Sequence, residues 1–266
     1  MLNLNKYSIG NFPVSYFPIT LEDIQMGARR KRVLFISAHP DDIEISCLAT
    51  VESLVEKGFC VYYLICSDGE ASSSASRDER LEESQMGALL AGRKIVNREH
   101  DQSSDQYLLS LNEQFKKQQG IAGIFYFHLP DTKLSFIPDL VPRIESLLRI
   151  IKPSLLFTHT VHDEHMDHKA VGQAVKTASY KTIPSVFAYC GPRIINEFSP
   201  NVFHAISSRE MKRKEEFLKL SFRTQMSPHF IERIRAIHKF FHLDSFAKGY
   251  PNTNYCEAYE VIRHLI

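Results

Sequence analysis

Hydrophobic residues follow two alternating patterns from residue 32 onward. Short apolar runs without polar alternation are typical of strands buried on both faces of a parallel sheet. Between these runs, apolar positions recur at helical spacing. The runs are RVLFIS (32–37), FCVYYLIC (59–66), IFYFHLP (124–130) and SLLFTHT (154–160), and the helical stretches are 43–57, 72–92, 138–152 and 168–180. The pattern predicts an α/β fold of three layers, in which a mostly parallel sheet carries helices on both faces.

The chain shows no internal repeat and no linker, so we expect a single domain over residues 1–266. Residues 1–30 precede the first expected strand and are expected to pack as an amino-terminal arm. Residues 31–180 hold the alternating core, and residues 181–266 form a carboxyl-terminal extension. In the extension we expect strands at 184–191 and 201–207 and helices at 208–220 and 228–243. These helices offer a surface on which copies of the chain could associate as an oligomer.

Composition and charge argue against two kinds of partner. The chain is 44% hydrophobic and 24% charged, with a formal net charge of +1. This balance gives no electrostatic attraction to nucleic acid or to an anionic membrane. Basic clusters at 29–32 and 212–214 are interpreted as solvated faces.

The cysteines and the amino terminus indicate a reducing compartment. The five cysteines are scattered and form no CxxC pair, which argues against a disulfide framework and against a thiolate zinc site. The stretch MLNLNKYSIGNFPVSYFPIT lacks the charged and apolar segments of a signal peptide. No run approaches the ~20 apolar residues that a membrane-spanning helix needs. We therefore expect a cytoplasmic protein without a membrane span.

Unusual polar residues follow the first expected strand. The stretch AHPDD places His39, Asp41 and Asp42 directly after the run 32–37. Two adjacent carboxylates repel each other and contribute nothing to a core, so they call for a positively charged partner. A dinucleotide site is excluded, because this turn lacks GxGxxG and its carboxylates would repel a pyrophosphate.

A second polar cluster follows the strand expected at 154–160. It holds four histidines, His159, His162, His165 and His168, in the stretch THTVHDEHMDH. His165 and His168 are three residues apart, so one turn of helix can aim both at one point. The carboxyl ends of parallel strands share one rim of the sheet, and we therefore expect this cluster to meet the AHPDD motif.

Together, the two motifs predict a metal site. His39, His168 and a carboxylate from Asp41 or Asp42 make the two-histidine, one-carboxylate ligand set of catalytic zinc, with a fourth position for water. Zinc-bound water can have a pKa near ~7, and the acid that does not bind metal is a natural general base for it. An imidazole on the other side would stabilise an oxyanion or protonate the leaving group. These parts suit hydrolysis of an amide or ester, and the ligand set also admits Fe²⁺.

Several motifs occur in the order found in one enzyme family. They are AHPDDIE at 38–44, SDGE at 67–70, RLEE at 80–83, LPD at 129–131, HMDH at 165–168 and YCEAYE at 255–260. Over residues 31–262 the chain resembles the PIG-L/LmbE-type deacetylases. The resemblance implies a Rossmann-like fold and a zinc-dependent hydrolase. Such an enzyme removes the N-acetyl group from an N-acetylglucosamine-type sugar or glycoconjugate and releases acetate and a free amine.

The resemblance also implies roles for individual residues. The zinc ligands would be His39, Asp42 and His168. Asp41 would be the general base, a choice between the two aspartates that spacing alone leaves open. His165 would be the imidazole that faces the scissile carbonyl.

Residues around this centre have supporting roles. Arg80 resembles the substrate-binding arginine of the family, which could bind sugar hydroxyls or a phosphate. Asp163 or Asp167 is expected to accept the second N–H of a metal-binding imidazole. Met166 stands where the family often has proline, and Cys256 where it has alanine. Neither difference touches the expected chemistry.

Two other functions are weighed against the deacetylase. A metal-dependent phosphoesterase often holds two metals, and the motifs supply too few carboxylates for a second site. A non-catalytic family member that binds sugar or metal should have lost at least one of His39, Asp41 and His165, and all three are present. His159 and His162 are interpreted as rim residues rather than substrate contacts.

Overall fold

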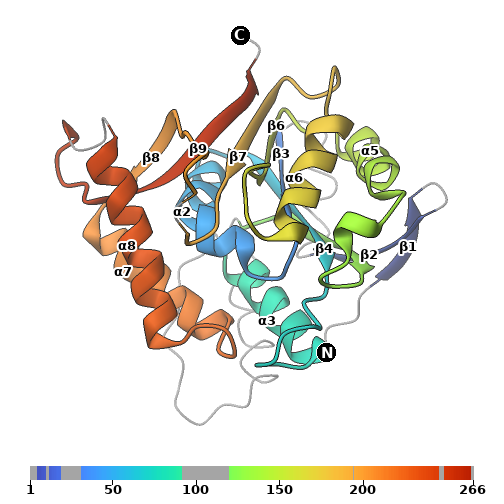
Figure 1. Cartoon of the computed structure of the whole chain (residues 1–266), viewed down its shortest axis with the longest axis horizontal. Helices are drawn as coiled ribbons and strands as arrows, with labels where there is room; N and C mark the ends of the chain where they lie inside the picture. The colour runs from blue at the N-terminus through green and yellow to red at the C-terminus, as the bar shows by residue number, and fades with distance from the viewer. Residues whose placement is uncertain are drawn as a thin grey trace.

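The computed structural model describes residues 5–9, 12–18, 31–91, 120–193, 195–245 and 249–264. Within these ranges, nine strands form one sheet in the order β1-β2-β5-β4-β3-β6-β7-β9-β8 (Figure 1). The strands are β1 (Asn5–Ile9), β2 (Phe12–Pro18), β3 (Arg32–Ser37), β4 (Cys60–Ser67), β5 (Gly123–Leu129), β6 (Leu155–His159), β7 (Ser185–Tyr189), β8 (Val202–Ile206) and β9 (Tyr255–His264). The helices are α2 (Asp42–Glu56), α3 (Arg77–Leu90), α5 (Leu140–Ile151), α6 (Met166–Ala178), α7 (Ser208–Ser221) and α8 (Pro228–Asp244), with a short 3₁₀ helix η1 (Leu134–Phe136).

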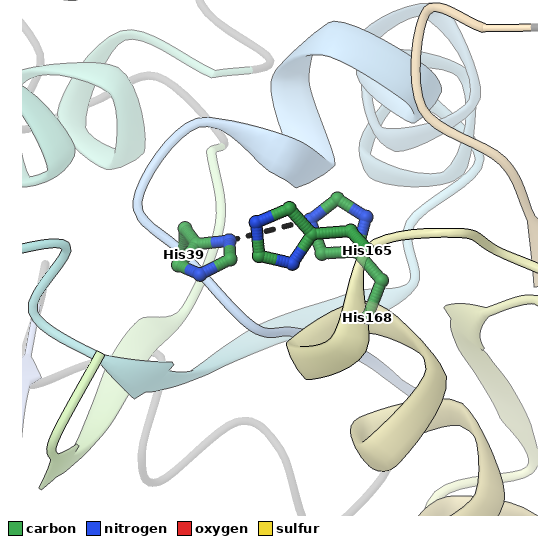
Figure 2. A group of neighbouring side chains, drawn as sticks. All are labelled: His39, His165 and His168. Atoms are coloured by element: carbon green, nitrogen blue, oxygen red, sulfur yellow. Dashed lines mark hydrogen bonds between the residues drawn. The ribbon is translucent and has the colours of Figure 1, made fainter. Parts of the chain in front are cut away.

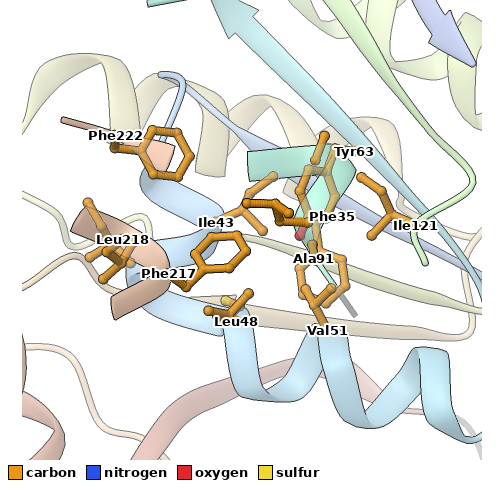
Figure 3. Packing of buried hydrophobic residues seen from close by; sticks show 14 of the residues in the cluster. Phe35, Ile43, Leu48, Val51, Tyr63, Ala91, Ile121, Phe217, Leu218 and Phe222 are labelled. Carbon is orange, nitrogen blue, oxygen red and sulfur yellow. The ribbon is translucent and has the colours of Figure 1, made fainter. Parts of the chain in front are cut away.

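The middle of the sheet is parallel. β3 pairs with β4 on one side and with β6 on the other, and β5 and β7 extend the parallel part outward. Successive side chains of β3 point to opposite faces, and each face has its own core. Val33 and Phe35 pack with α2, α3 and α7 (Figure 3), whereas Leu34 and Ile36 pack with α5 and α6. The structure thus confirms the predicted α/β class, with helices on both faces of a mostly parallel sheet.

The sheet begins earlier in the chain than the sequence suggested. β1 and β2 pair antiparallel with each other, and β2 adds antiparallel to β5. The expectation that the sheet starts at residue 32 was therefore wrong. Pro13 and Pro18 lie near the two ends of β2, and proline in a short apolar run argues against a strand when only the sequence is considered. The rest of the expected amino-terminal arm lies outside the described residues.

The carboxyl-terminal extension forms the other edge of the sheet. β9 pairs antiparallel with β7, and β8 pairs antiparallel with β9. α7 and α8 begin at the N-caps Ser207 and Ser227, whose side chains accept backbone N–H groups of the first turn. Among the described helices, none has the length and apolar character that crossing a membrane requires.

The strand order reverses between β3 and β6. From β3 the chain continues through α2 to β4 on one side, whereas β6 lies on the other side of β3. The crevice outside the carboxyl ends of two such strands is where α/β sheets bind ligands. The AHPDD motif follows β3 and the histidine cluster follows β6. The topology therefore brings His39 and His168 together although 129 residues separate them.

A buried polar network joins the extension to the core. The Nζ atom of Lys214 in α7 lies 2.8 Å from His238 Nε2 in α8 and 2.8 Å from Glu257 Oε1 in β9. The Glu257 carboxylate also accepts the backbone N–H groups of Ala49 and Thr50 in α2, at 2.9 and 2.8 Å. All three charged or titratable side chains are at most 5% exposed. Removing one partner would leave a buried charge uncompensated, so the network fixes α7 and α8 against α2.

This network predicts a dependence of stability on pH. Burial and the charge of Lys214 lower the pKa of His238 to about 3, against about 6.5 in an unfolded chain. Below about pH 6.5 the unfolded chain therefore gains a proton that the folded chain does not, and the free energy of unfolding falls. As the pH falls from about 7 to about 4, the free energy of unfolding should decrease less in His238→Gln than in the wild type. The difference should reach up to about 3 kcal/mol.

Urea denaturation at several pH values measures this difference. His229→Gln is the matched control, because His229 lies on the same helix and is exposed. Identical pH profiles for His238→Gln and the wild type would contradict the prediction.

Candidate active site

The AHPDD motif forms a tight turn between β3 and α2. The backbone N–H of His39 donates to Asp42 Oδ2 at 2.8 Å. The carbonyl of Asp41 accepts a hydrogen bond from the backbone N–H of Ile45 at 2.9 Å. Asp42 therefore lies in the first turn of α2, where the helix dipole favours a negative charge. The turn folds the Asp42 carboxylate back over His39.

The histidines come from β6 and from the first turn of α6. His159 ends β6, His165 is the N-cap of α6, and His168 follows within the first turn. α6 approaches β6 closely because Gly172 has no side chain. A Cβ at this position would lie 2.5 Å from the carbonyl oxygen of His159. The glycine thus allows His168 to reach the end of the neighbouring strand.

Four side-chain atoms of three residues from the two motifs converge. His39 Nδ1 lies 3.2 Å from His168 Nε2 (Figure 2), His168 Nε2 lies 3.3 Å from Asp42 Oδ1, and His39 Nδ1 lies 3.4 Å from Asp42 Oδ2. The three side chains are only 11–12% exposed. Two ligands of a tetrahedral zinc ion are about 3.3 Å apart, given metal–ligand distances of about 2.0–2.1 Å. The spacing of these atoms therefore fits a divalent metal.

Outer hydrogen bonds determine which ring nitrogens face the centre. His168 Nδ1 lies 2.9 Å from Asp163 Oδ2, and His39 Nε2 lies 3.0 Å from Asp131 Oδ1. Carboxylates only accept hydrogen bonds, so in neutral rings these two nitrogens carry the protons and the opposite nitrogens present lone pairs. In that state the two lone pairs and an Asp42 oxygen face one another. A cation would stabilise this arrangement.

The electrostatics of the cluster favour positive charge. Burial lowers the pKa of His168, but the charge of Asp42 and the hydrogen bond to Asp163 raise it to about 9. Burial raises the pKa of Asp42, yet His168 and His159 hold it well below its usual value. Among the described residues, three groups could hold a metal ion, namely His39–His165–His168, Asp42–His159–His168 and His39–Asp131–Asp167, and the first shares one residue with each of the others. Each group contains His39 or His168, which places them around one centre.

Asp131 is an acceptor for a histidine of this centre that the sequence did not suggest. Asp163 or Asp167 was expected in this role, and the structure pairs Asp163 with His168. For His39 Nε2, Asp167 Oδ2 lies at 3.4 Å, whereas Asp131 Oδ1 is closer, at 3.0 Å. Asp131 follows β5 in the LPD motif. Its place at the same rim of the parallel sheet was a signal that could have identified it.

Asp41 and Arg80 form a buried ion pair beside the cluster. Arg80 Nη1 lies 3.1 Å from Asp41 Oδ2, and the two side chains are 5% and 11% exposed. Burial raises the pKa of the Asp41 carboxyl to about 6, although the guanidinium of Arg80 lowers it. A carboxyl with a pKa near the working pH suits a general base. The structure thus brings the expected base and the expected substrate-binding arginine into direct contact.

The ring of His165 lies beside those of His39 and His168 (Figure 2). Its ring centroid lies 4.9 Å from that of His39 and 4.5 Å from that of His168. Its Nδ1 accepts the backbone N–H of Asp167 at 3.3 Å, which leaves the proton of a neutral ring on Nε2. Burial and the neighbouring imidazoles lower the pKa of His165. The residue therefore offers a neutral imidazole with one N–H donor.

His159 differs from its interpretation as a rim residue. Its side chain is fully buried, stacks on His168 with 4.0 Å between the ring centroids, and places Nε2 3.1 Å from Asp42 Oδ2. His162 is exposed on the loop that follows. The strand expected at 154–160 already contained His159, and the structure keeps this residue in the layer of the sheet as the last residue of β6. His159 therefore supports Asp42 and His168 from the buried side.

Known proteins resemble this chain in sequence and in fold. Residues 34–179, more than half of the chain, match the PIG-L family, described as GlcNAc-PI de-N-acetylase. YaiS, an uncharacterized deacetylase of Escherichia coli K12, is 27% identical over 184 residues, which cover 67% of this chain and 83% of YaiS.

Two solved structures share the fold, each with a TM-score of 0.64. N,N′-diacetylchitobiose deacetylase from Pyrococcus horikoshii is 18% identical, and the match covers 92% of this chain and 88% of that one. The 4-carboxy-2-hydroxymuconate hydratase GalB from Pseudomonas putida is 16% identical, and the match covers 89% and 98%. At these identities the two structures show a common fold and leave the reaction open.

Proposed function

The chain belongs to the PIG-L family of deacetylases, and on this premise we propose that it is a zinc-dependent N-deacetylase. Its substrate is an N-acetylglucosamine-type sugar or glycoconjugate, and its products are acetate and a free amine. The observation that carries the proposal is the triangle formed by the side chains of His39, Asp42 and His168, in which His39 Nδ1, His168 Nε2 and the Asp42 carboxylate oxygens approach one another to 3.2–3.4 Å. Asp41 and His165, the other two groups that hydrolysis needs, lie beside this triangle.

The residues around the triangle divide the work of amide hydrolysis. A divalent metal held by His39, Asp42 and His168 would polarise the amide carbonyl and acidify the attacking water. Asp41 takes the proton of that water as its oxygen adds to the carbonyl carbon. The Nε2–H of His165 donates to the carbonyl oxygen as negative charge develops there. When the C–N bond breaks, Asp41 passes the proton that it took from the water to the amine nitrogen, and acetate and the amino sugar leave.

Two other reactions are alternatives to deacetylation. The hydratase among the structural neighbours adds water without releasing acetate, and its similarity in fold equals that of the chitobiose deacetylase. A phosphoesterase with two metals would need a second ligand set. The family match favours the deacetylase over both.

A product assay tests the proposed function. The zinc-loaded protein is incubated with N-acetyl-D-glucosamine, its methyl glycoside and N,N′-diacetylchitobiose, and acetate and free amine are measured in each reaction. We expect at least one sugar to yield the two products in equal amounts, with Asp41→Asn protein as the blank. Phosphate release from a phosphate ester, with no acetate from any sugar, would support the phosphoesterase instead.

A further inference from the structure

We propose that Arg80 positions the carboxylate of Asp41 and that Gly69 seats Arg80 for this role. The inference rests on the proposed function, in which Asp41 takes the proton of the attacking water. It differs from the role that family resemblance suggests for Arg80, which is contact with the sugar. Contacts of α3 and of the turn that follows β4 support it.

The ion pair between Arg80 and Asp41 is enclosed by protein. With side-chain exposures of 5% and 11%, the arginine has little surface left for a ligand. Asp41 also has a φ of 130°, a conformation that L-residues rarely adopt and that persists only when surrounding contacts enforce it. The bond from Arg80 Nη1 to Asp41 Oδ2, at 3.1 Å, is such a contact. It fixes the direction in which the carboxylate points.

Gly69 packs against Arg80 and against Pro40. Its φ is +69°, and a Cβ built on it would lie 2.7 Å from Arg80 Nε and 3.2 Å from Pro40 Cδ. Pro40 immediately precedes Asp41 in the turn after β3. Arg80 Nε is buried and has no hydrogen-bond partner in the described part of the chain. The guanidinium is therefore held on this side by packing against the Gly69 backbone.

The same turn anchors the start of α3. Asp68 Oδ2 accepts a hydrogen bond from Arg77 Nε at 2.6 Å, and Asp68 Oδ1 lies 2.7 Å from His128 Nδ1 in β5. Ser76 and Glu79 form a reciprocal capping box at the start of the helix. Arg80 lies one residue after Glu79. These bonds fix the first turn of α3 and so limit where the Arg80 side chain can go.

Arg80→Gln separates positioning from sugar binding. If Arg80 positions Asp41, kcat for the methyl glycoside of N-acetyl-D-glucosamine should fall by about a hundredfold. KM should change by less than about threefold, and bound zinc should not change. Arg80→Lys keeps the charge but not the planar fork, and should recover part of the lost kcat. A large rise in KM with kcat retained would assign Arg80 to the sugar and overturn the proposal.

Gly69→Ala and Gly58→Ala form a matched pair for the role of Gly69. Both glycines have a positive φ, +69° and +80°, so alanine is strained at either position. Nothing lies within 4 Å of a Cβ at position 58, whereas a Cβ at position 69 meets Arg80. We expect kcat to fall about tenfold or more in Gly69→Ala and to stay within about twofold in Gly58→Ala. Equal kcat values in the two variants would overturn the role of Gly69.

A double-mutant cycle tests the ion pair without relying on deacetylation. Unfolding constants are measured in urea for metal-stripped wild type, Asp41→Ala, Arg80→Ala and the double variant. We expect the two substitutions to be coupled by about tenfold or more in the unfolding constant. Additive effects would overturn the pairing. If the two substitutions are coupled but the wild type releases no acetate, the pairing of Arg80 with Asp41 stands and the proposed function fails.

Discussion

His168→Ala should lower the affinity for zinc by about two to three orders of magnitude, because each ligand of a zinc site contributes about 3 kcal/mol. The substitution removes one corner of the triangle that His39 and Asp42 complete. It also leaves Asp163 without the imidazole that it contacts at 2.9 Å. Competition with a chromophoric chelator measures the affinity directly. At limiting zinc, deacetylation should be lost together with the metal.

His162→Ala is the matched control for this loss. His162 lies on the loop that precedes α6, six positions before His168, and its side chain is exposed. We expect its removal to leave the zinc affinity unchanged. If His168→Ala also leaves the zinc affinity unchanged, the zinc binds elsewhere.

Asp41→Asn should keep zinc and lose most of its turnover. The amide has nearly the same shape as the carboxylate, and its oxygen can still accept the hydrogen bond from Arg80. It cannot take a proton from water, so we expect kcat to fall by about 10²–10⁴. Metal analysis and acetate release, measured on the same preparation, separate the two effects.

The adjacent aspartate should behave differently. Asp42→Asn removes a charged ligand from the triangle, and we expect it to lower the affinity for zinc directly. The pair of variants thus distinguishes a proton acceptor from a metal ligand at neighbouring positions. Near-normal turnover in Asp41→Asn would exclude Asp41 as the base, and full zinc affinity in Asp42→Asn would exclude Asp42 as a ligand.

The central sheet and its functional rim could be predicted from the sequence because their signals are local. The unbroken apolar runs at 32–37 and 154–160 contain β3 and β6, and the polar motif after each run lies at the carboxyl rim. Strand direction then requires the two motifs to be neighbours. The proximity of His39 and His168 follows from this topology without knowledge of any loop conformation.

Other parts of the site depend on contacts that no local pattern encodes. The hydrogen bond of Asp131 to His39 spans 92 positions and depends on how the loop after β5 folds. The burial of His159 depends on its packing against His168 and Asp42. The contact of Arg80 with Asp41 depends on the turn at Gly69 and on the rotation of α3.

Strand β2 also depends on contacts that its local sequence does not encode. β2 joins the sheet through pairing with β5, more than a hundred positions later in the chain, from Ser15 with Tyr126 to Pro18 with Gly123. Its own sequence, with prolines near both ends, carries little of that information.

Metal dependence through His39, Asp42 and His168 is tested most directly by titrating zinc into chelator-stripped protein. Acetate release from the methyl glycoside of N-acetyl-D-glucosamine is followed after each addition. We expect the rate to rise in proportion to bound zinc and to level off at one ion per chain. Full activity in the stripped protein, or no activity at any level of zinc or Fe²⁺, would contradict metal dependence through these residues.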